Sequence, residues 1–542
     1  MKLKPLMYVI NHIYQLNTSR IRRFTASSVL YQFCRDRFYR PIRATVHPAQ
    51  PNHQALLTFL FYVPYYLTSN PALLLMPPAP YTSTTRPVQT AVPPDTIWSR
   101  VIEDEFREHL VTLEKQTNAV LMDVLTAEGD DEQQDSSSLS LPLKREKQVA
   151  DDIAYIAAVT EGAQSVAAVC LEQHISTSLA LNHPTLVVRV AGMDVLDGNV
   201  KEMLQAVVAE LQSLFQAESS TEAIFHLIIQ QHEQKLLGRL RSRKWTKPKH
   251  LARTHKKPLW QDFDNLLHRV QHVFARRSER KVREAIGTSI REIGNKFKDF
   301  EVSGSETAQA LQELVKATFV WCKSPLIAAY ASRLETAGDT RQVAAAIKTL
   351  RQLEKIGAYW RIAQDLVAMA KQYKQVFQRI HLEYVTPYAS IPTSIAYESW
   401  ARTCHVHAEI QLVVELAKSA SQQAANPLTV MVRPRTIGTS KYLCYLCYLF
   451  LRYHGEFQLL NSHGRLYDQW TVPDLAEYNT ATRNKFAVVL ESMDEHVVQQ
   501  IKETQCIIWR PEPMTSRQNL LLLGAEPAVD TLEAGVDKLF MS

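Results

Sequence analysis

The hydrophobic pattern of residues 147–215 predicts a helix, two strands and a second helix, in that order. Val149–Val159 has its apolar residues at helical spacing. Ser165–Glu172 and Thr185–Gly192 are short valine-rich runs, which suit buried strands. Helical periodicity returns over Val200–Phe215. We expect this region to open an α/β domain.

From residue 216 to residue 398 the apolar spacing is predominantly helical. Ser303 and Glu306 have the spacing of a capping box immediately before Ala308–Trp321. Apolar residues recur at helical intervals along Leu350–Ile380, and such stripes are typical of a helix core. We interpret 216–398 as a large helical insertion within the α/β domain.

Residues 399–475 return to short elements of both kinds. The pattern predicts a helix over Ser399–Ser419, a strand over Leu428–Val432, a helix capped by Thr439 or Ser440 and ending near His454, and a strand over Glu456–Leu460. Residues 476–542 form a C-terminal helix and tail, and the helix, around Ala476–Lys502, should pack on this domain. The fold class expected is therefore α/β, three-layer α/β/α with a mixed sheet.

The N-terminal region differs in composition. Residues 1–94 are basic and become proline-rich, which predicts a poorly ordered leader, with a mitochondrial targeting segment as the alternative. The apolar run Ala55–Leu67 is too short for a membrane span, so membrane attachment is not favoured. Residues 95–146 hold one helix, within Ile97–Leu125, and then the acidic, serine-rich linker Glu128–Ser140.

The bulk composition is that of an ordinary soluble protein of 542 residues, 46% hydrophobic and 21% charged. Its seven cysteines are irregularly spaced, which argues against a disulfide framework and for a reducing, intracellular compartment, cytoplasm or nucleus. The net charge of +6 is regional, because residues 1–94 carry ten Lys or Arg against one acid.

A second basic feature lies within the helical region. Arg241–Lys257 holds eight Lys or Arg, no acid and one tryptophan. Such a cluster can neutralise phosphates, and the tryptophan can stack on a base. The candidate contacts to RNA or DNA are Arg241, Arg243, Lys244, Trp245, Lys247 and Lys249. The alternatives are a solvated loop and a nuclear localisation signal.

The candidate chemistry lies in four residues of 399–475. His407 and Glu409 stand near the start of one expected helix, and Cys444 and Cys447 stand three apart in another. A helix N-terminus favours thiolate over thiol. Two thiolates and one imidazole would leave one zinc ion an open position for water, whose pKa the metal lowers. Glu409 is then placed to collect the proton.

These residues carry a family resemblance. Cys404-His405-Val406-His407-Ala408-Glu409, Ser440 to Cys447, Ser462 to Tyr467, and Trp470 resemble the cytidine-deaminase-like zinc deaminase superfamily, especially a fungal branch related to bacterial toxin-type deaminases. The valine-rich runs look like the first two strands of that fold. The clear match covers about 400–470, with a weaker likeness from 147 to Pro511-Glu512-Pro513.

The resemblance implies a zinc-dependent hydrolytic deaminase of a cytosine- or adenine-type base in a nucleic acid or nucleotide. His407, Cys444 and Cys447 would hold one zinc ion and Glu409 would move the proton. Cys404, His405, Ser440, Lys441 and His463 would lie beside the ligands or the pocket. Leu443 stands where many deaminases have proline, and Gly192 where many have the asparagine that holds the sugar, so the substrate pocket is not of the free-nucleoside type.

Two other functions stay open. The first is a catalytically inactive module in which a structural zinc site, closed by a fourth protein ligand such as Cys404 or His405, supports binding of nucleic acid or a protein partner. The second is an effector-like protein directed to an organelle or membrane by its basic leader.

Overall fold

A computed structural model describes residues 96–121, 140–160, 165–176, 184–214, 220–251, 253, 255–303, 307–423, 429–459, 461–510 and 520–521. The leader 1–94, the linker Glu128–Ser140 except its last residue, and Pro511–Pro513 lie outside the described residues. None of the described helices is long and apolar enough to cross a membrane.

Two helices come first among the described elements. Strands β1 and β2 precede the long run of helices, and strands β3 to β7 follow it. Helices are α4 (Glu103–Gln116), α5 (Leu143–Ala157), α6 (Gly198–Ser213), α7 (Thr221–Leu240), α8 (Phe263–Val273), α9 (Arg280–Val302), α10 (Thr307–Cys322), α11 (Pro325–Glu335), α12 (Arg341–Gln372), α13 (Lys374–Phe377), α14 (Ala408–Gln423), α15 (Tyr445–His454) and α16 (Thr480–Glu503). Short 3-10 turns are η2 (Lys249–Leu251), η3 (Leu259–Asp262) and η4 (Arg277–Glu279). Strands are β1 (Ala167–Ser176), β2 (Thr185–Gly192), β3 (Ile380–Tyr384), β4 (Ile391–Pro392), β5 (Thr403–Cys404), β6 (Thr429–Val432) and β7 (Gly438–Thr439).

The central sheet is mixed, as expected. Its strand order is β3-β2-β1-β6, with β7 also paired to β1. β1 runs antiparallel to β2, β6 and β7, whereas β2 and β3 are parallel. A parallel pair needs a crossover connection, and the chain from α6 to α13 is that crossover. The position of the helical region between β2 and β3 follows from this pairing.

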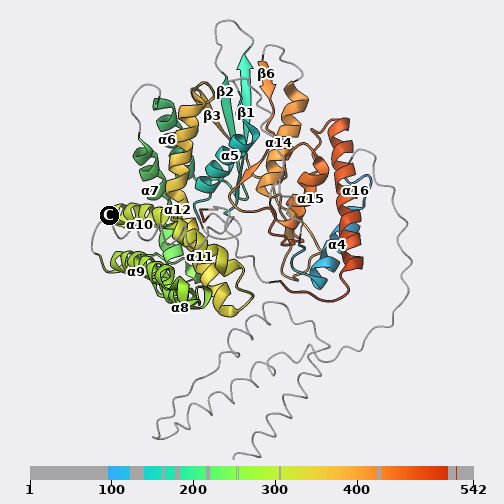
Figure 1. Ribbon diagram of the computed structural model, residues 1–542. Helices are drawn as coiled ribbons and strands as arrows, with labels where there is room; N and C mark the ends of the chain where they lie inside the picture. The colour runs from blue at the N-terminus through green and yellow to red at the C-terminus, as the bar shows by residue number, and fades with distance from the viewer. Residues whose placement is uncertain are drawn as a thin grey trace, which may run out of the picture. The chain divides into compact units, whose positions relative to one another are not determined.

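The sheet separates two hydrophobic cores. Alternate strand residues point to opposite faces, so Val169, Leu171 and Val188 join the core formed with the crossover helices, while Ala168 and Cys170 join the other. α5, α6 and α12 lie on the first side of the sheet, and α14, α15 and α16 lie on the second (Figure 1). The three-layer α/β/α arrangement with a mixed sheet is therefore confirmed.

The crossover helices pack around α12, which contacts α5, α7, α8 and α10. Its buried face includes Leu353, Ile356, Tyr359 and Ile362, so the apolar stripe expected along Leu350–Ile380 is a core stripe. The end of that range differs from the prediction, because Ile380 begins strand β3. On the other side of the sheet α16 packs against α15 and α4, as expected for the C-terminal helix.

Three local predictions in 399–475 were wrong. The first helix begins at Ala408 and not at Ser399, because β5 pairs with β4 and keeps the chain extended until His407. The second helix begins at Tyr445, because Thr439 and Ser440 are occupied in pairing with β1. No strand forms over the described residues 456–459, which follow the left-handed Gly455 at the end of α15.

Two glycines of residues 399–475, Gly438 and Gly464, allow neighbouring segments to approach closely. A Cβ on Gly438 would lie 2.2 Å from the carbonyl carbon of Ala150, so β7 can pack directly on α5 only with glycine. Gly464 has a φ of +71°, and a Cβ there would lie 2.1 Å from the carbonyl oxygen of Val120. Both positions adjoin the segments that lead into and follow α15.

Candidate functional site

His407 is held where an extended segment turns into α14. The carbonyl oxygen of His407 accepts a hydrogen bond from the backbone amide of Gln411, so His407 occupies the N-cap position of α14. The segment before it is fixed by main-chain bonds, from the amide of His405 to the carbonyl of Gln469 (2.7 Å) and from the amide of Thr471 to the carbonyl of His405 (3.1 Å). The imidazole therefore projects from a backbone that is tied on both sides.

The two cysteines lie at the N-terminus of α15. Cys444 is the N-cap, and its sulfur accepts a hydrogen bond from the amide of Cys447 at 3.4 Å. Both side chains are buried. The free amides and the dipole of the helix start favour negative charge on sulfur at this position. The predicted placement of two thiols at a helix start is thus correct, although Cys444 precedes the helix and only Cys447 lies inside it.

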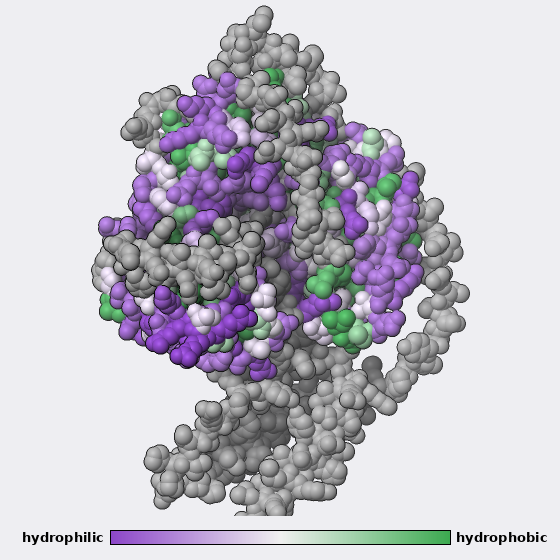
Figure 2. Space-filling model, in the orientation of Figure 1, coloured by the Kyte–Doolittle hydropathy of each residue, from purple (hydrophilic) through white to green (hydrophobic). Residues whose placement is uncertain are grey.

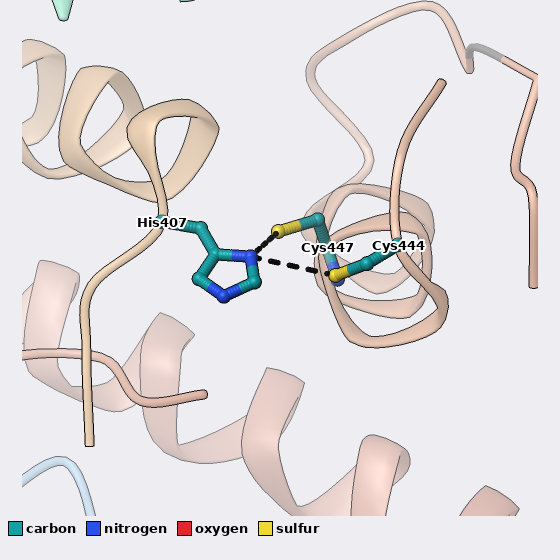
Figure 3. Close-up of side chains that lie close together, drawn as sticks. All are labelled: His407, Cys444 and Cys447. Carbon is teal, nitrogen blue, oxygen red and sulfur yellow. Dashed lines mark hydrogen bonds between the residues drawn. The ribbon is translucent and has the colours of Figure 1, made fainter. Parts of the chain in front are cut away.

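His407, Cys444 and Cys447 converge in space (Figure 3). His407 Nδ1 lies 3.5 Å from the sulfur of Cys444 and 3.3 Å from that of Cys447. One ligand atom from each side chain falls within 4.8 Å of the others, and this is the group of metal-type donors found among the described residues. The three residues could hold one metal ion.

Glu409 lies beside these three donors without belonging to their cluster. It is in the first turn of α14 and is 4% exposed. Its Oε2 lies 3.6 Å from the sulfur of Cys447, which donates to it. A carboxyl group is therefore present next to the donor atoms and is shielded from most solvent.

The protonation of the cluster is uneven. Burial alone would raise the pKa of Cys444, but bonds from Cys447 and the charge of His407 outweigh it and hold that pKa well below its usual value. Burial and the neighbouring Cys444 raise the pKa of Cys447 well above its usual value. Burial also raises the pKa of Glu409. These opposite shifts favour the thiolate on Cys444 and the thiol on Cys447.

The residues expected beside the site occupy different places. Cys404 is buried and accepts a hydrogen bond from Arg107, and exposed His405 contacts the hydroxyl of Thr403 (3.3 Å). Ser440 is tied to β1, since its hydroxyl accepts from the amide of Ala167 (3.1 Å), and Lys441 is exposed. Neither Cys404 nor His405 belongs to the donor cluster.

His463 and Tyr467 form an aromatic edge next to His407. The rings of His407 and Tyr467 are 6.1 Å apart, and those of Tyr467 and His463 are 6.2 Å apart in a T-shaped contact. Burial lowers the pKa of His463, so its imidazole is neutral near pH 7. That His463 faces a substrate pocket stays a prediction. Tyr467 is 42% exposed and offers an aromatic surface on which a planar ring can stack.

Sequence reasoning missed two residues that support the site. Arg107 of α4, 4% exposed, donates to the sulfur of Cys404 (2.6 Å) and to the hydroxyl of Thr471 (3.2 Å). The side-chain Nε2 of Gln411 donates to the carbonyls of Gly192 and Val406, both at 3.0 Å, and so joins the end of β2 to the start of α14. Neither residue belongs to a motif, and only the tertiary contacts reveal them.

The six candidate nucleic-acid residues divide into two groups. Arg241 is ion-paired with Asp262, the ammonium of Lys244 donates to the carbonyl of Ser303, and Trp245 packs against Gly238 in the helical core. These three side chains serve the fold. Arg243, Lys247 and Lys249 are exposed.

The comparisons with known proteins agree with the geometry of the donor cluster. No curated protein and no solved structure matches the chain. The family model of the OTT_1508-like deaminases matches residues 406–474, a range that contains His407, Glu409, Cys444 and Cys447. That range also includes His463 and Tyr467. Residues 406–474 are therefore similar to a deaminase family, and this match is consistent with the expected resemblance to cytidine-deaminase-like, toxin-type deaminases.

Proposed function

We propose that this protein is a zinc-dependent hydrolytic deaminase acting on the amino group of a cytosine- or adenine-type base in a nucleic acid or nucleotide. The observation that carries the proposal is the buried Glu409 beside a three-donor cluster. A structural metal site has no need of a carboxylate next to its ligands but outside the ligand set. The deaminase segment that contains all four residues supports the same chemistry.

The donor set fits zinc. With zinc–sulfur bonds of about 2.3 Å and zinc–nitrogen bonds of about 2.1 Å, tetrahedral ligation separates a sulfur and a nitrogen by about 3.6 Å. The sulfurs of Cys444 and Cys447 lie 3.5 Å and 3.3 Å from His407 Nδ1. Two thiolates and one imidazole are also donors that zinc prefers. A zinc ion held by these three residues would supply Lewis-acid activation of a water molecule.

The proton transfers fall to Glu409. Its carboxylate would accept the proton of the attacking water and protonate the ring nitrogen next to the amino-bearing carbon. It would then carry a proton to the departing amino group, which leaves as ammonia. Burial raises the pKa of Glu409, which makes its carboxylate a stronger base toward the attacking water and helps it hold the proton until the second half of the reaction. Tyr467, whose ring is 6.1 Å from that of His407, would offer a stacking face to the base.

The inactive-module alternative requires a closed metal site. In that case a fourth protein ligand should complete the cluster. Among the described residues the cluster has three donors, and the two candidates for a fourth are directed elsewhere, Cys404 to Arg107 and His405 to Thr403. These contacts favour an open site.

A cytoplasmic or nuclear location, which the cysteine usage indicates, stays a prediction.

The test measures metal content and ammonia release on the same preparations of wild type and Glu409→Gln. Substrates would be cytosine and adenine nucleosides, nucleotides, and single-stranded RNA and DNA. We expect about one zinc per chain in both proteins and ammonia from wild type alone. Zinc in both proteins without ammonia from any substrate would favour the inactive module. Wild type without zinc would refute the site.

A further inference from the structure

The stretch from Arg241 to Glu301 is strongly basic. It holds 17 Lys or Arg against seven Asp or Glu, a net charge of +10 in a chain whose total is +6. Among the described residues of this stretch, 13 Lys or Arg are exposed, against four acids. A solvated surface usually mixes both signs, so this excess is more than solubility requires.

α9 carries part of the excess as one continuous stripe. Its buried face contains Val282, Ile286, Ile290, Ile293 and Phe297. A stripe of exposed residues at alternating spacings of four and three follows the helix and its preceding turn: Arg277, Lys281, Glu284, Thr288, Arg291, Asn295 and Lys298. We call these seven residues the α9 stripe. At 1.5 Å per residue it is about 30 Å long.

The acids near the stripe do not cancel its charge. Glu284 is its single acidic member, and Arg280 pairs with it at a distance of 2.8 Å. Glu292 and Asp299 are exposed one position to the side, next to Arg291 and Lys298. The four cations of the stripe therefore have three acids near them, and two of these acids lie to the side of the stripe. Arg276 and Lys296 add further exposed positive charge beside it.

The C-terminal end of the stripe meets the basic segment Arg241–Lys257. The ammonium of Lys298 lies 5.9 Å from the centre of the Trp260 ring. The amide of Arg243 donates to Glu301 (3.1 Å), and Lys244 lies over the ring of Phe300 (4.5 Å). The exposed cations of the segment thus extend the stripe. Figure 2 shows a dense hydrophilic surface over α8 and α9.

We propose that the α9 stripe and the basic segment together bind the phosphate backbone of a single-stranded nucleic acid. Four cations distributed along one exposed stripe that has no apolar member match the phosphates of a polynucleotide backbone. An anionic membrane would instead call for exposed apolar residues among the cations, to enter the acyl region. Binding to this surface is independent of catalysis. Only the further step, that the bound strand supplies the base for Glu409, rests on the proposed function.

The test is fluorescence anisotropy with a labelled 20-nucleotide single-stranded RNA and the DNA of the same sequence. The test variant is the triple substitution Lys281→Glu, Arg291→Glu and Lys298→Glu. The matched control changes three exposed cations of α12 in the same way, Arg341→Glu, Lys348→Glu and Lys371→Glu. Both variants alter the net charge by six, so general charge effects are equal.

We expect the stripe variant to bind at least tenfold more weakly at 150 mM salt and the α12 variant to bind like wild type. The slope of log affinity against log salt should fall by about 2, since each lost contact contributes about 0.7 on a single strand. Equal loss in both variants, or binding by wild type to anionic lipid vesicles but not to the oligonucleotides, would overturn the proposal.

A second readout separates this proposal from the proposed function. Glu409→Gln should bind the oligonucleotides as wild type does and release no ammonia. The stripe variant should keep the wild-type rate on a mononucleotide and lose it on the oligonucleotide. Binding that depends on the stripe, in a protein that releases no ammonia from any substrate, would leave the surface intact and refute the deaminase alone.

Discussion

Buried cysteines on the two sides of the sheet have opposite acid–base properties. Cys322 of α10 is fully buried among the crossover helices, and burial raises its pKa well above the usual value. Cys444 is 5% exposed, yet its pKa is held well below the usual value by Cys447 and His407. Burial alone keeps a thiol protonated and inert, whereas a helix start and a neighbouring imidazole favour the thiolate, which is the form that can bind a metal.

The same contrast applies to the two sides as wholes. On the crossover side, side chains repeat along long helices and form an apolar core, with charge directed outward on α9. On the other side, residues far apart in the sequence meet at helix starts and loops, as Arg107 meets Cys404 and His407 meets Cys447. The first side forms a scaffold with a charged surface, and the second side holds the donor cluster.

The largest expected effect concerns the two buried glutamates. Glu409→Gln should reduce ammonia release by about 10²–10⁴-fold with fold and metal content unchanged, because it removes the group that moves protons. Glu354 on the crossover side is fully buried and paired with Arg351 (2.8 Å). Glu354→Gln should cost about 1–3 kcal/mol of stability, yet keep the rate per folded molecule. An equal loss of rate per folded molecule in both variants would contradict the assignment of the proton transfers to Glu409 alone.

The cysteines give the next effect. Cys444→Ser should lower zinc content at least tenfold and reduce the melting temperature, since a hydroxyl is a poor zinc ligand. Cys322→Ala should retain zinc, because its thiol is a core group and lies outside the donor cluster. Elemental analysis of both purified proteins checks this. Loss of zinc from Cys322→Ala, with zinc retained in Cys444→Ser, would refute the assignment of Cys444 as a zinc ligand.

A core substitution tests the scaffold. Leu353 is fully buried on α12. Leu353→Ala should lower the free energy of unfolding by about 2–5 kcal/mol, through lost burial and the cavity left behind. Urea denaturation measures the change, and zinc per folded molecule should stay at the wild-type level. Failure of zinc binding in the folded variant would mean that the two sides are not separable.

The smallest effect is a pH dependence of stability. Burial lowers the pKa of His454 from 6.5 to about 4, so between those values the unfolded chain binds a proton that the folded chain does not. The stabilising contribution is complete above pH 6.5 and is lost as the pH falls to about 4. His454→Phe, placed between Phe450 and Phe457, should lose less stability on acidification than wild type. An unchanged acid midpoint would count against this, although His232, whose pKa is also lowered by burial, remains in both proteins.

The sequence predicted the strands and the long helices well because their signals are local. The valine-rich run Thr185–Gly192 formed a strand at the expected residues and is buried on both faces. The apolar stripe along Leu350–Ile380 belongs to a helix, α12, that begins at Arg341 and ends at Gln372. The starts of α14 and α15 were predicted wrongly. Thr439 is a good capping residue by type, but its backbone bonds to β1, a partner more than 200 residues away.

By itself, therefore, the sequence determined the α/β class, the helical crossover and the four residues of the candidate site, since these depend on residue type and spacing. Only the tertiary structure decided which neighbours those residues have. It directed Arg107 to Cys404 and Gln411 to Gly192, and it divided the basic segment into side chains that serve the fold and side chains that face solvent. The physical reason is that burial, hydrogen bonding and charge pairing depend on segments that only the fold brings together.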